Sequence, residues 1–122
     1  MKSTKISCII PTCDRLDLLK LTLESVLGQT VMPREILIIN NGLKDINFED
    51  INNPDHEKNN IKIFNLPKYA GLAQSLNFGS SIAEGEYLAF LEDDDLWELD
   101  YINKLSESLS SEFQAYVARI DK

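Results

Sequence analysis

Four consecutive carboxylates, Glu92 to Asp95, follow an apolar stretch at residues 86–91 that has the character of a β-strand. Like charges this close repel one another, and the repulsion is strongest where water is partly excluded. A divalent cation relieves it, because Mg²⁺ and Mn²⁺ prefer hard oxygen ligands and complete their coordination with water and phosphate. The run therefore indicates a metal ion that holds a nucleoside diphosphate. The alternative is a solvated acidic turn in which Asp94 or Asp95 caps a helix.

A parallel sheet covered by helices would place this acidic run at the end of one of its strands. The predicted strands, which are short and apolar, lie at residues 5–10, 34–39, 61–66 and 87–91, with a fifth at 113–120. The predicted helices, whose apolar residues recur at helical spacing, lie at residues 16–29, 71–83 and 96–110. Strands that alternate with helices indicate an α/β fold, here a single three-layer, Rossmann-like domain with a mostly parallel sheet.

The helix ends carry signals of their own. Asp14 or Asp17 is expected to cap the first helix. Residues 45–60 are polar and contain Pro54, so they predict at most a short or irregular helix. Because Leu96 opens the third predicted helix, the acidic run would lie immediately before a helix.

The loops that follow the four strands should meet at one edge of the sheet, where open α/β sheets bind ligands. These loops comprise residues 11–15, 40–42, 66–71 and 92–95. The amide of Asn41 both donates and accepts hydrogen bonds, so it can read the edge of a pyrimidine base. Gly71 allows a ligand to approach the backbone closely. Each feature alone is explained by turn chemistry, and their convergence is what favours a nucleotide site.

The composition argues against several classes of protein. The net charge of −8 and the pI near 4.5 disfavour binding to nucleic acid, which requires a basic surface, and provide no polybasic patch for a membrane. No apolar run approaches the roughly 20 residues that span a bilayer, and residues 6–11 are too short for a signal-peptide core. A cytoplasmic protein is therefore expected. Cys8 and Cys13 are expected to remain free thiols, and the single histidine, His56, lies in a polar loop.

The order and spacing of five segments carry a family resemblance. The segments are residues 6–15, 25–30, 35–42, 71–79 and 83–95. Together they resemble the nucleotide-binding half of inverting family 2 glycosyltransferases with the GT-A fold, and the resemblance extends to about Leu109. It implies transfer of a sugar, with inversion and with Mg²⁺ or Mn²⁺, from a nucleoside-diphosphate sugar to an acceptor hydroxyl. It further implies a UDP-sugar as donor, a sugar or glycolipid as acceptor, and a role in polysaccharide or glycoconjugate synthesis.

The resemblance also assigns roles to individual residues. Those implied to bind the nucleotide-sugar are Pro11, Thr12, Cys13, Arg15, Asn41, Gly71, Asn77, Glu92 and Asp93. Asn41 would contact the base, Asn77 would lie under the diphosphate-sugar, and Glu92 or Asp93 would face the ribose. Glu92 and Asp94 occupy the two acidic positions of the family's DXD motif and are implied to hold the metal ion.

Several residues depart from the family pattern. Asn40 and Asn41 replace an acidic pair, and Leu76 stands where many members carry an arginine. Cys13 occupies a position at which an aromatic residue often stacks on the base. These departures bear on which nucleotide is bound more than on the class of protein.

Members of the family extend well beyond the 122 residues of this chain. The acceptor-binding half, and the general base that deprotonates the acceptor hydroxyl, are therefore expected beyond residue 122, because Asp100, Glu107 and Glu112 read as solvent-facing charges. Residues 1–122 would then form the nucleotide-sugar-binding domain of a truncated chain. The alternative is a non-catalytic nucleotide-binding or assembly module. Association with the inner face of the membrane and a homo-oligomer are left open.

Overall fold

Four strands form one sheet at the centre of the structure, a computed structural model that describes residues 5–109. The strands are β1 (Ile6–Thr12), β2 (Glu35–Asn40), β3 (Ile61–Asn65) and β4 (Tyr87–Phe90), in the order β3-β2-β1-β4. The helices are α1 (Leu16–Leu27), α2 (Phe48–Ile51), α3 (Leu72–Ile82) and α4 (Tyr101–Leu109). Neighbouring strands are parallel throughout, which confirms the predicted α/β fold. The fifth predicted strand, at residues 113–120, lies outside the described residues.

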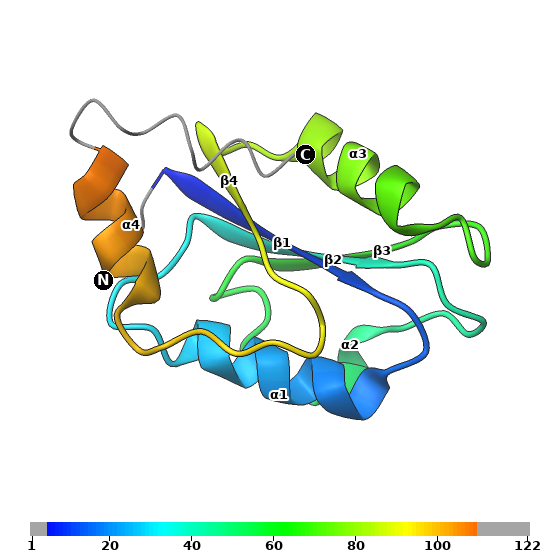
Figure 1. The fold of residues 1–122 in the computed structure, drawn as a ribbon. Coiled ribbons are helices and arrows are strands. Elements are labelled where there is room, and N and C mark those ends of the chain that lie inside the picture. Colours follow the sequence, from blue (N-terminus) through cyan, green and yellow to red (C-terminus); the bar gives the residue numbers. More distant parts are fainter. Residues whose placement is uncertain (1–4, 110–122) are drawn as a thin grey trace.

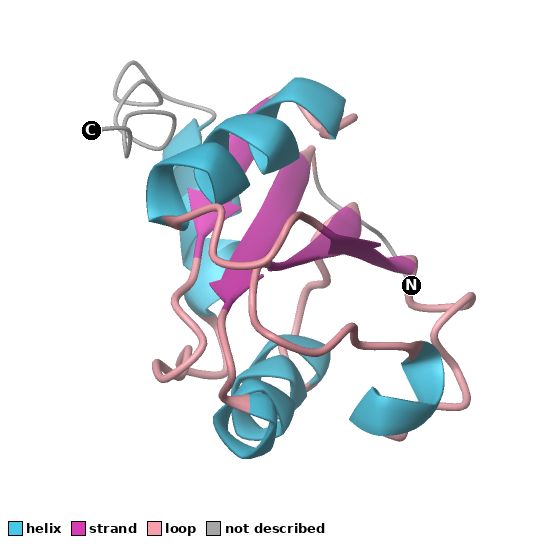
Figure 2. Cartoon of the chain, turned by 90° about the vertical axis from the view of Figure 1, so that its right-hand side faces the viewer, coloured by secondary structure: helices cyan, strands magenta, loops and turns pink. Residues whose placement is uncertain are grey.

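Helices cover both faces of the sheet, as Figures 1 and 2 show. Successive side chains of a strand point to opposite faces. Cys8 and Ile10 of β1 accordingly join a buried cluster with α1, whereas Ile9 joins a second cluster with α3. A third cluster places Ile6 of β1 against Ile102 of α4. β1 is therefore buried along its whole length, and the predicted three-layer arrangement is confirmed.

Close contact between α3 and β1 depends on Gly79. A Cβ atom at this position would lie 2.8 Å from Cγ2 of Ile9, well inside van der Waals contact. Gly79→Val is therefore expected to lower the free energy of unfolding by about 1–3 kcal/mol, the usual cost of overpacking a core. Urea denaturation measures this loss. Ser80→Val is the control, since Ser80 is exposed on the same helix, and an equal loss in both variants would contradict the packing argument.

The other helices differ in how they begin. The polar segment contains only the short helix α2, as predicted, with a capping box formed by Asn47 and Asp50. α1 has no such cap, because Arg15 occupies its N-cap position and its side chain makes no capping hydrogen bond to the helix. The expectation that Asp14 or Asp17 caps α1 is therefore wrong.

Among residues 5–109, no helix combines the length and the apolar character that crossing a bilayer requires.

α4 begins later than the sequence predicts. Its first residue is Tyr101, and residues 96–100 contain no helix. Neither Asp94 nor Asp95 therefore caps a helix, and the capping interpretation of the acidic run is wrong.

The late start of α4 follows from hydrogen bonds to two residues just beyond α1, Gln29 and Thr30. The side-chain amide of Gln29 donates to the carbonyl of Glu98 at 2.6 Å, and the Thr30 N–H donates to the carbonyl of Leu99 at 2.9 Å. A first helical turn at residues 96–100 would use these carbonyls for its own hydrogen bonds. Gln29 Oε1 also accepts from the Ile102 N–H at 2.9 Å, so a distant side chain satisfies an amide at the start of α4.

Candidate functional site

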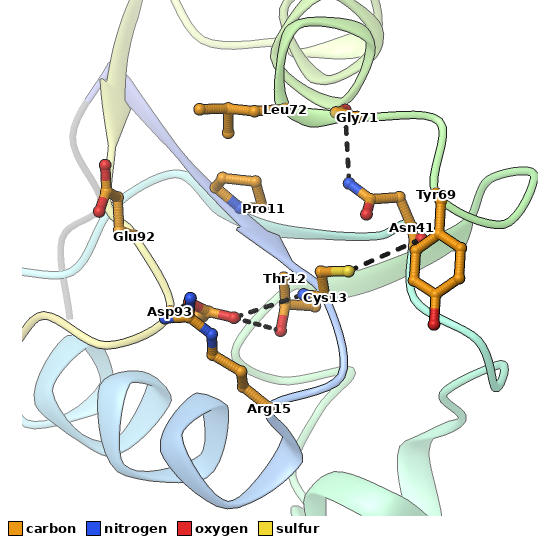
Figure 3. A pocket seen from close by; sticks show the side chains of 10 residues that line it. All are labelled: Pro11, Thr12, Cys13, Arg15, Asn41, Tyr69, Gly71, Leu72, Glu92 and Asp93. Atoms are coloured by element: carbon orange, nitrogen blue, oxygen red, sulfur yellow. Dashed lines mark hydrogen bonds and ion pairs between the residues drawn. The ribbon is translucent and has the colours of Figure 1, made fainter.

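A cavity of about 360 Å³ opens at the carboxyl edge of the sheet, where the predicted loops meet. The residues that line it, drawn in Figure 3, are Pro11, Thr12, Cys13, Arg15, Asn41, Tyr69, Gly71, Leu72, Glu92 and Asp93. All of the residues predicted to bind the nucleotide-sugar are among them except Asn77. Asn77 lies exposed on α3, beyond the first turn, whereas Leu72 at the start of that helix reaches the cavity. The structure therefore does not bring Asn77 to this site.

The cavity has two chemically different ends. Figure 3 shows Glu92 and Asp93 at one end and Asn41 and Tyr69 at the other, with Pro11 between them. Carboxylates gather at the first end, and an amide and an aromatic ring lie at the second. The arrangement suits an elongated ligand with a charged part and a planar polar part.

Asp93 joins the acidic turn to the loop after β1. The residue is 6% exposed, and its Oδ2 accepts from the Thr12 hydroxyl at 2.8 Å and from the Cys13 N–H at 3.4 Å. Its Oδ1 pairs with Arg15 Nη1 at 3.5 Å. Because both carboxylate oxygens have partners in the loop, Asp93 positions Thr12, Cys13 and Arg15. This is a holding role, different from the contact with ribose that the resemblance implies.

The hydroxyl of Thr22 on α1 forms hydrogen bonds with the backbone of the acidic turn. Its hydroxyl lies 2.9 Å from the carbonyl oxygen of Asp93 and 2.8 Å from that of Asp95, and it donates to one of them at a time. Thr22 is fully buried. It was not predicted, since a small hydroxyl residue inside an amphipathic helix carries no distinctive sequence signal.

The three remaining carboxylates of the run form a cluster. Oxygen atoms of Glu92, Asp94 and Asp95 lie within 4.8 Å of one another, and all three side chains are exposed. Hard, negatively charged oxygens near water are the donor set that suits Mg²⁺ or Mn²⁺, so the cluster fits the implied metal ion. Asp95 joins the two predicted ligands. Arg15 Nη1 pairs with Asp94 at 3.1 Å, which places a counter-charge directly beside the cluster.

Hydrogen bonds orient the side chain of Asn41. Its Nδ2 donates to Ser75 Oγ at 2.6 Å, and the Ser75 hydroxyl donates in turn to the carbonyl of Gly71 at 2.9 Å. With Nδ2 bound on this side, Oδ1 becomes the acceptor that the amide offers to a ligand. Asn40 has a different role, because its Oδ1 accepts from the Gly42 N–H at 2.9 Å and so closes the turn.

Asp14 links two loops at the outer end of the cavity. Its Oδ1 accepts from the Leu43 N–H at 2.7 Å, and its Oδ2 accepts from the Tyr69 hydroxyl at 2.9 Å. The hydrogen bond to Asp14 raises the pKa of Tyr69 above its ordinary value. Asp14 therefore braces the loops of the cavity, which explains why it does not cap α1.

The sequence of this chain matches a known protein family and several of its members. The sequence profile of the family described as Glycosyl transferase family 2 matches residues 7–122. The chain belongs to this glycosyltransferase family. An uncharacterized glycosyltransferase of Rickettsia felis is 37% identical over 102 residues, which cover 84% of this chain and 17% of that protein. One of Haemophilus influenzae is 32% identical over 104 residues, covering 85% of this chain and 42% of that protein. The chain thus spans less than half of either relative.

Solved structures of glycosyltransferases share the fold. A mannosyltransferase from Pyrobaculum calidifontis, in complex with GDP-Man and Mn²⁺, superposes with a TM-score of 0.78 at 19% identity, over 92% of this chain and 34% of that one. Staphylococcus aureus TarS in complex with UDP-GlcNAc gives a TM-score of 0.73 at 20% identity, over 86% of this chain and 31% of that one. The sheet and its helices therefore have the GT-A arrangement, as predicted.

Proposed function

We propose that this glycosyltransferase domain binds a UDP-sugar together with Mg²⁺ or Mn²⁺ and serves inverting transfer of the sugar to an acceptor hydroxyl. The observation that carries the proposal is that one cavity is lined both by Glu92, a member of the acidic cluster, and by the oriented amide of Asn41. A sugar or glycolipid acceptor, at the cytoplasmic face of the membrane and in polysaccharide or glycoconjugate assembly, is part of the same proposal.

The ligands of the structural relatives support a nucleotide-sugar donor, and one of these structures also contains Mn²⁺. The mannosyltransferase carries GDP-Man and Mn²⁺, and TarS carries UDP or UDP-GlcNAc. In this chain Asn41 Oδ1 is the available acceptor, and uracil presents an N–H at the centre of its hydrogen-bonding edge. Uracil is therefore the better complement than cytosine, which presents a ring nitrogen acceptor at the same place.

The residues at the two ends of the cavity would then have different roles in binding. Glu92, Asp94 and Asp95 would hold the metal ion, which when bound stabilises the negative charge that develops on the leaving nucleoside diphosphate. Asp93 fixes the loop that carries Arg15, and Asn41 orients the base. We assign no general base among residues 5–109, where Asp100 pairs with Lys104 at 3.6 Å and Glu107 is an exposed residue of α4.

Calorimetric titration of UDP into the purified chain tests the proposal. Binding is expected with Mn²⁺ and is expected to disappear with EDTA, because the diphosphate would otherwise face uncompensated carboxylates. CDP is the matched control and is expected to bind about tenfold more weakly, since its N3 atom cannot donate to Asn41. Absence of UDP binding with Mn²⁺ would remove the donor-site assignment and favour a non-catalytic module.

A further inference from the structure

We propose that Tyr69 forms the wall against which the nucleobase stacks, a role that rests on the proposed nucleotide function. Tyr69 lines the same end of the cavity as Asn41, and the residue is 59% exposed. Large aromatic rings normally gain stability by burial, so a ring left open at a cavity rim is available to a ligand. Among residues 5–109, no other aromatic ring stacks on it.

The backbone at Tyr69 adopts a conformation that favours glycine. Its φ angle is 54°, in the left-handed region, which is uncommon for a bulky side chain. Such a conformation persists only where the surroundings hold it, and it is concentrated at ligand sites. The Tyr69 N–H donates to the carbonyl of Asn41 at 2.6 Å, and this bond ties the ring to the residue that would read the base.

The hydroxyl fixes the other end of the ring. It donates to Asp14 Oδ2 at 2.9 Å, and Asp14 is itself bound to the Leu43 N–H. The ring is thus anchored at both ends, which lowers the entropy that stacking on a ligand would cost. Asn41 would bind the edge of the base while Tyr69 covers its face. The two contacts are complementary, because stacking fixes the plane in which the edge is read.

Two variants separate stacking from bracing. Tyr69→Ala removes the ring and the hydroxyl together, whereas Tyr69→Phe removes only the hydrogen bond to Asp14. With Mn²⁺ present, Tyr69→Ala is expected to weaken UDP binding about tenfold or more, the usual effect of losing one base–aromatic stack. Tyr69→Phe is expected to stay within about threefold of the native chain, because its ring remains. Binding of inorganic pyrophosphate with Mn²⁺, which has no base, is expected to be unchanged in both.

Proton NMR of UDP with Mg²⁺ adds a direct readout, since stacking on a ring shifts the uracil H5 and H6 signals upfield. The shift is expected with the native chain and with Tyr69→Phe, and it is expected to vanish with Tyr69→Ala. Equal UDP affinity in the native chain and Tyr69→Ala, or an equal loss of UDP and pyrophosphate binding, would overturn the inference while the donor site stands. Failure of the native chain to bind UDP with Mn²⁺ would overturn both.

Discussion

Replacing Asp94 by asparagine is expected to abolish metal-dependent binding of UDP. Asp94 belongs to the acidic cluster with Glu92 and Asp95, and asparagine keeps its size while removing the charge. Mutating a residue that hydrogen-bonds a metal ligand typically lowers metal affinity or activity 10–100-fold. Loss of a ligand itself is therefore expected to lower the affinity at least about 100-fold. Calorimetry with UDP and Mn²⁺ measures the affinity, and Mn²⁺ alone measures the metal site itself.

The control for this variant is Glu98→Gln. Glu98 is exposed and lies outside the acidic cluster. Glu98→Gln changes the net charge by the same amount as Asp94→Asn. Its substitution is expected to leave UDP binding within about twofold, because exposed charges are screened by salt over about 10 Å. Native affinity in Asp94→Asn, or an equal loss in Glu98→Gln, would show that Asp94 is not a ligand.

Glu35→Ala is expected to cause the largest loss of stability. Glu35 lies at the amino edge of the sheet and is fully buried. Its Oε2 accepts from the Ser7 hydroxyl at 2.7 Å and from the Glu84 N–H at 2.6 Å, and Lys62 Nζ lies 3.3 Å from its Oε1. Removing the carboxylate leaves buried donors unsatisfied, which costs about 3–5 kcal/mol. Urea denaturation at pH 7 measures the loss.

The same carboxylate makes this loss depend on pH. Burial alone would raise the pKa of Glu35, but hydrogen bonds from Glu84, Ser7 and Lys62, with the charge of Lys62, lower it below its ordinary value. A lowered pKa stabilises the fold above the unfolded value of about 4.3, and this stabilisation disappears as the pH falls through the folded pKa. The difference between the native chain and Glu35→Ala is therefore expected to shrink in acid.

Glu86→Ala provides the comparison for Glu35. Glu86 pairs with Lys5 at 3.8 Å, and its side chain is 62% exposed. Surface pairs of this kind contribute about 0–1 kcal/mol, so its substitution is expected to have a small effect with little dependence on pH. A loss below about 1 kcal/mol in Glu35→Ala would mean that the buried cluster is not important for stability.

Predictions from the sequence succeeded where local pattern and topology determine the answer. The apolar runs of β1 and β2 are buried strands, and parallel connections bring every loop that follows a strand to one edge. Pro11, Asn41 and Glu92 therefore line one cavity even though they are far apart in the chain. The capping roles of Asp94 and Asp95 failed, because the start of α4 depends on hydrogen bonds to Gln29 that no local pattern reports.

The side-chain contacts that orient the residues of the site could not be predicted from the sequence either. Ser75 orients Asn41 from α3, and Thr22 supports the acidic turn from α1, but each looks like an ordinary residue of its helix. Asp14 looks like a helix cap, and only the structure shows its side chain turned toward Tyr69. Such side-chain partnerships form between elements, so they appear only when the packing is known.

The support that α1 gives to the acidic end of the cavity has a consequence for evolution and design. Arg15, at the N-cap of α1, pairs with Asp94, and Thr22 of α1 binds the backbone of the acidic turn. Gln29, just beyond the end of the helix, binds Glu98 and Ile102. One helix and the residue that follows it therefore hold the segment that runs from the acidic turn to the start of α4. A shift of α1 would move the acidic turn and the start of α4 with it, so the placements of these three segments are expected to vary together among homologous domains.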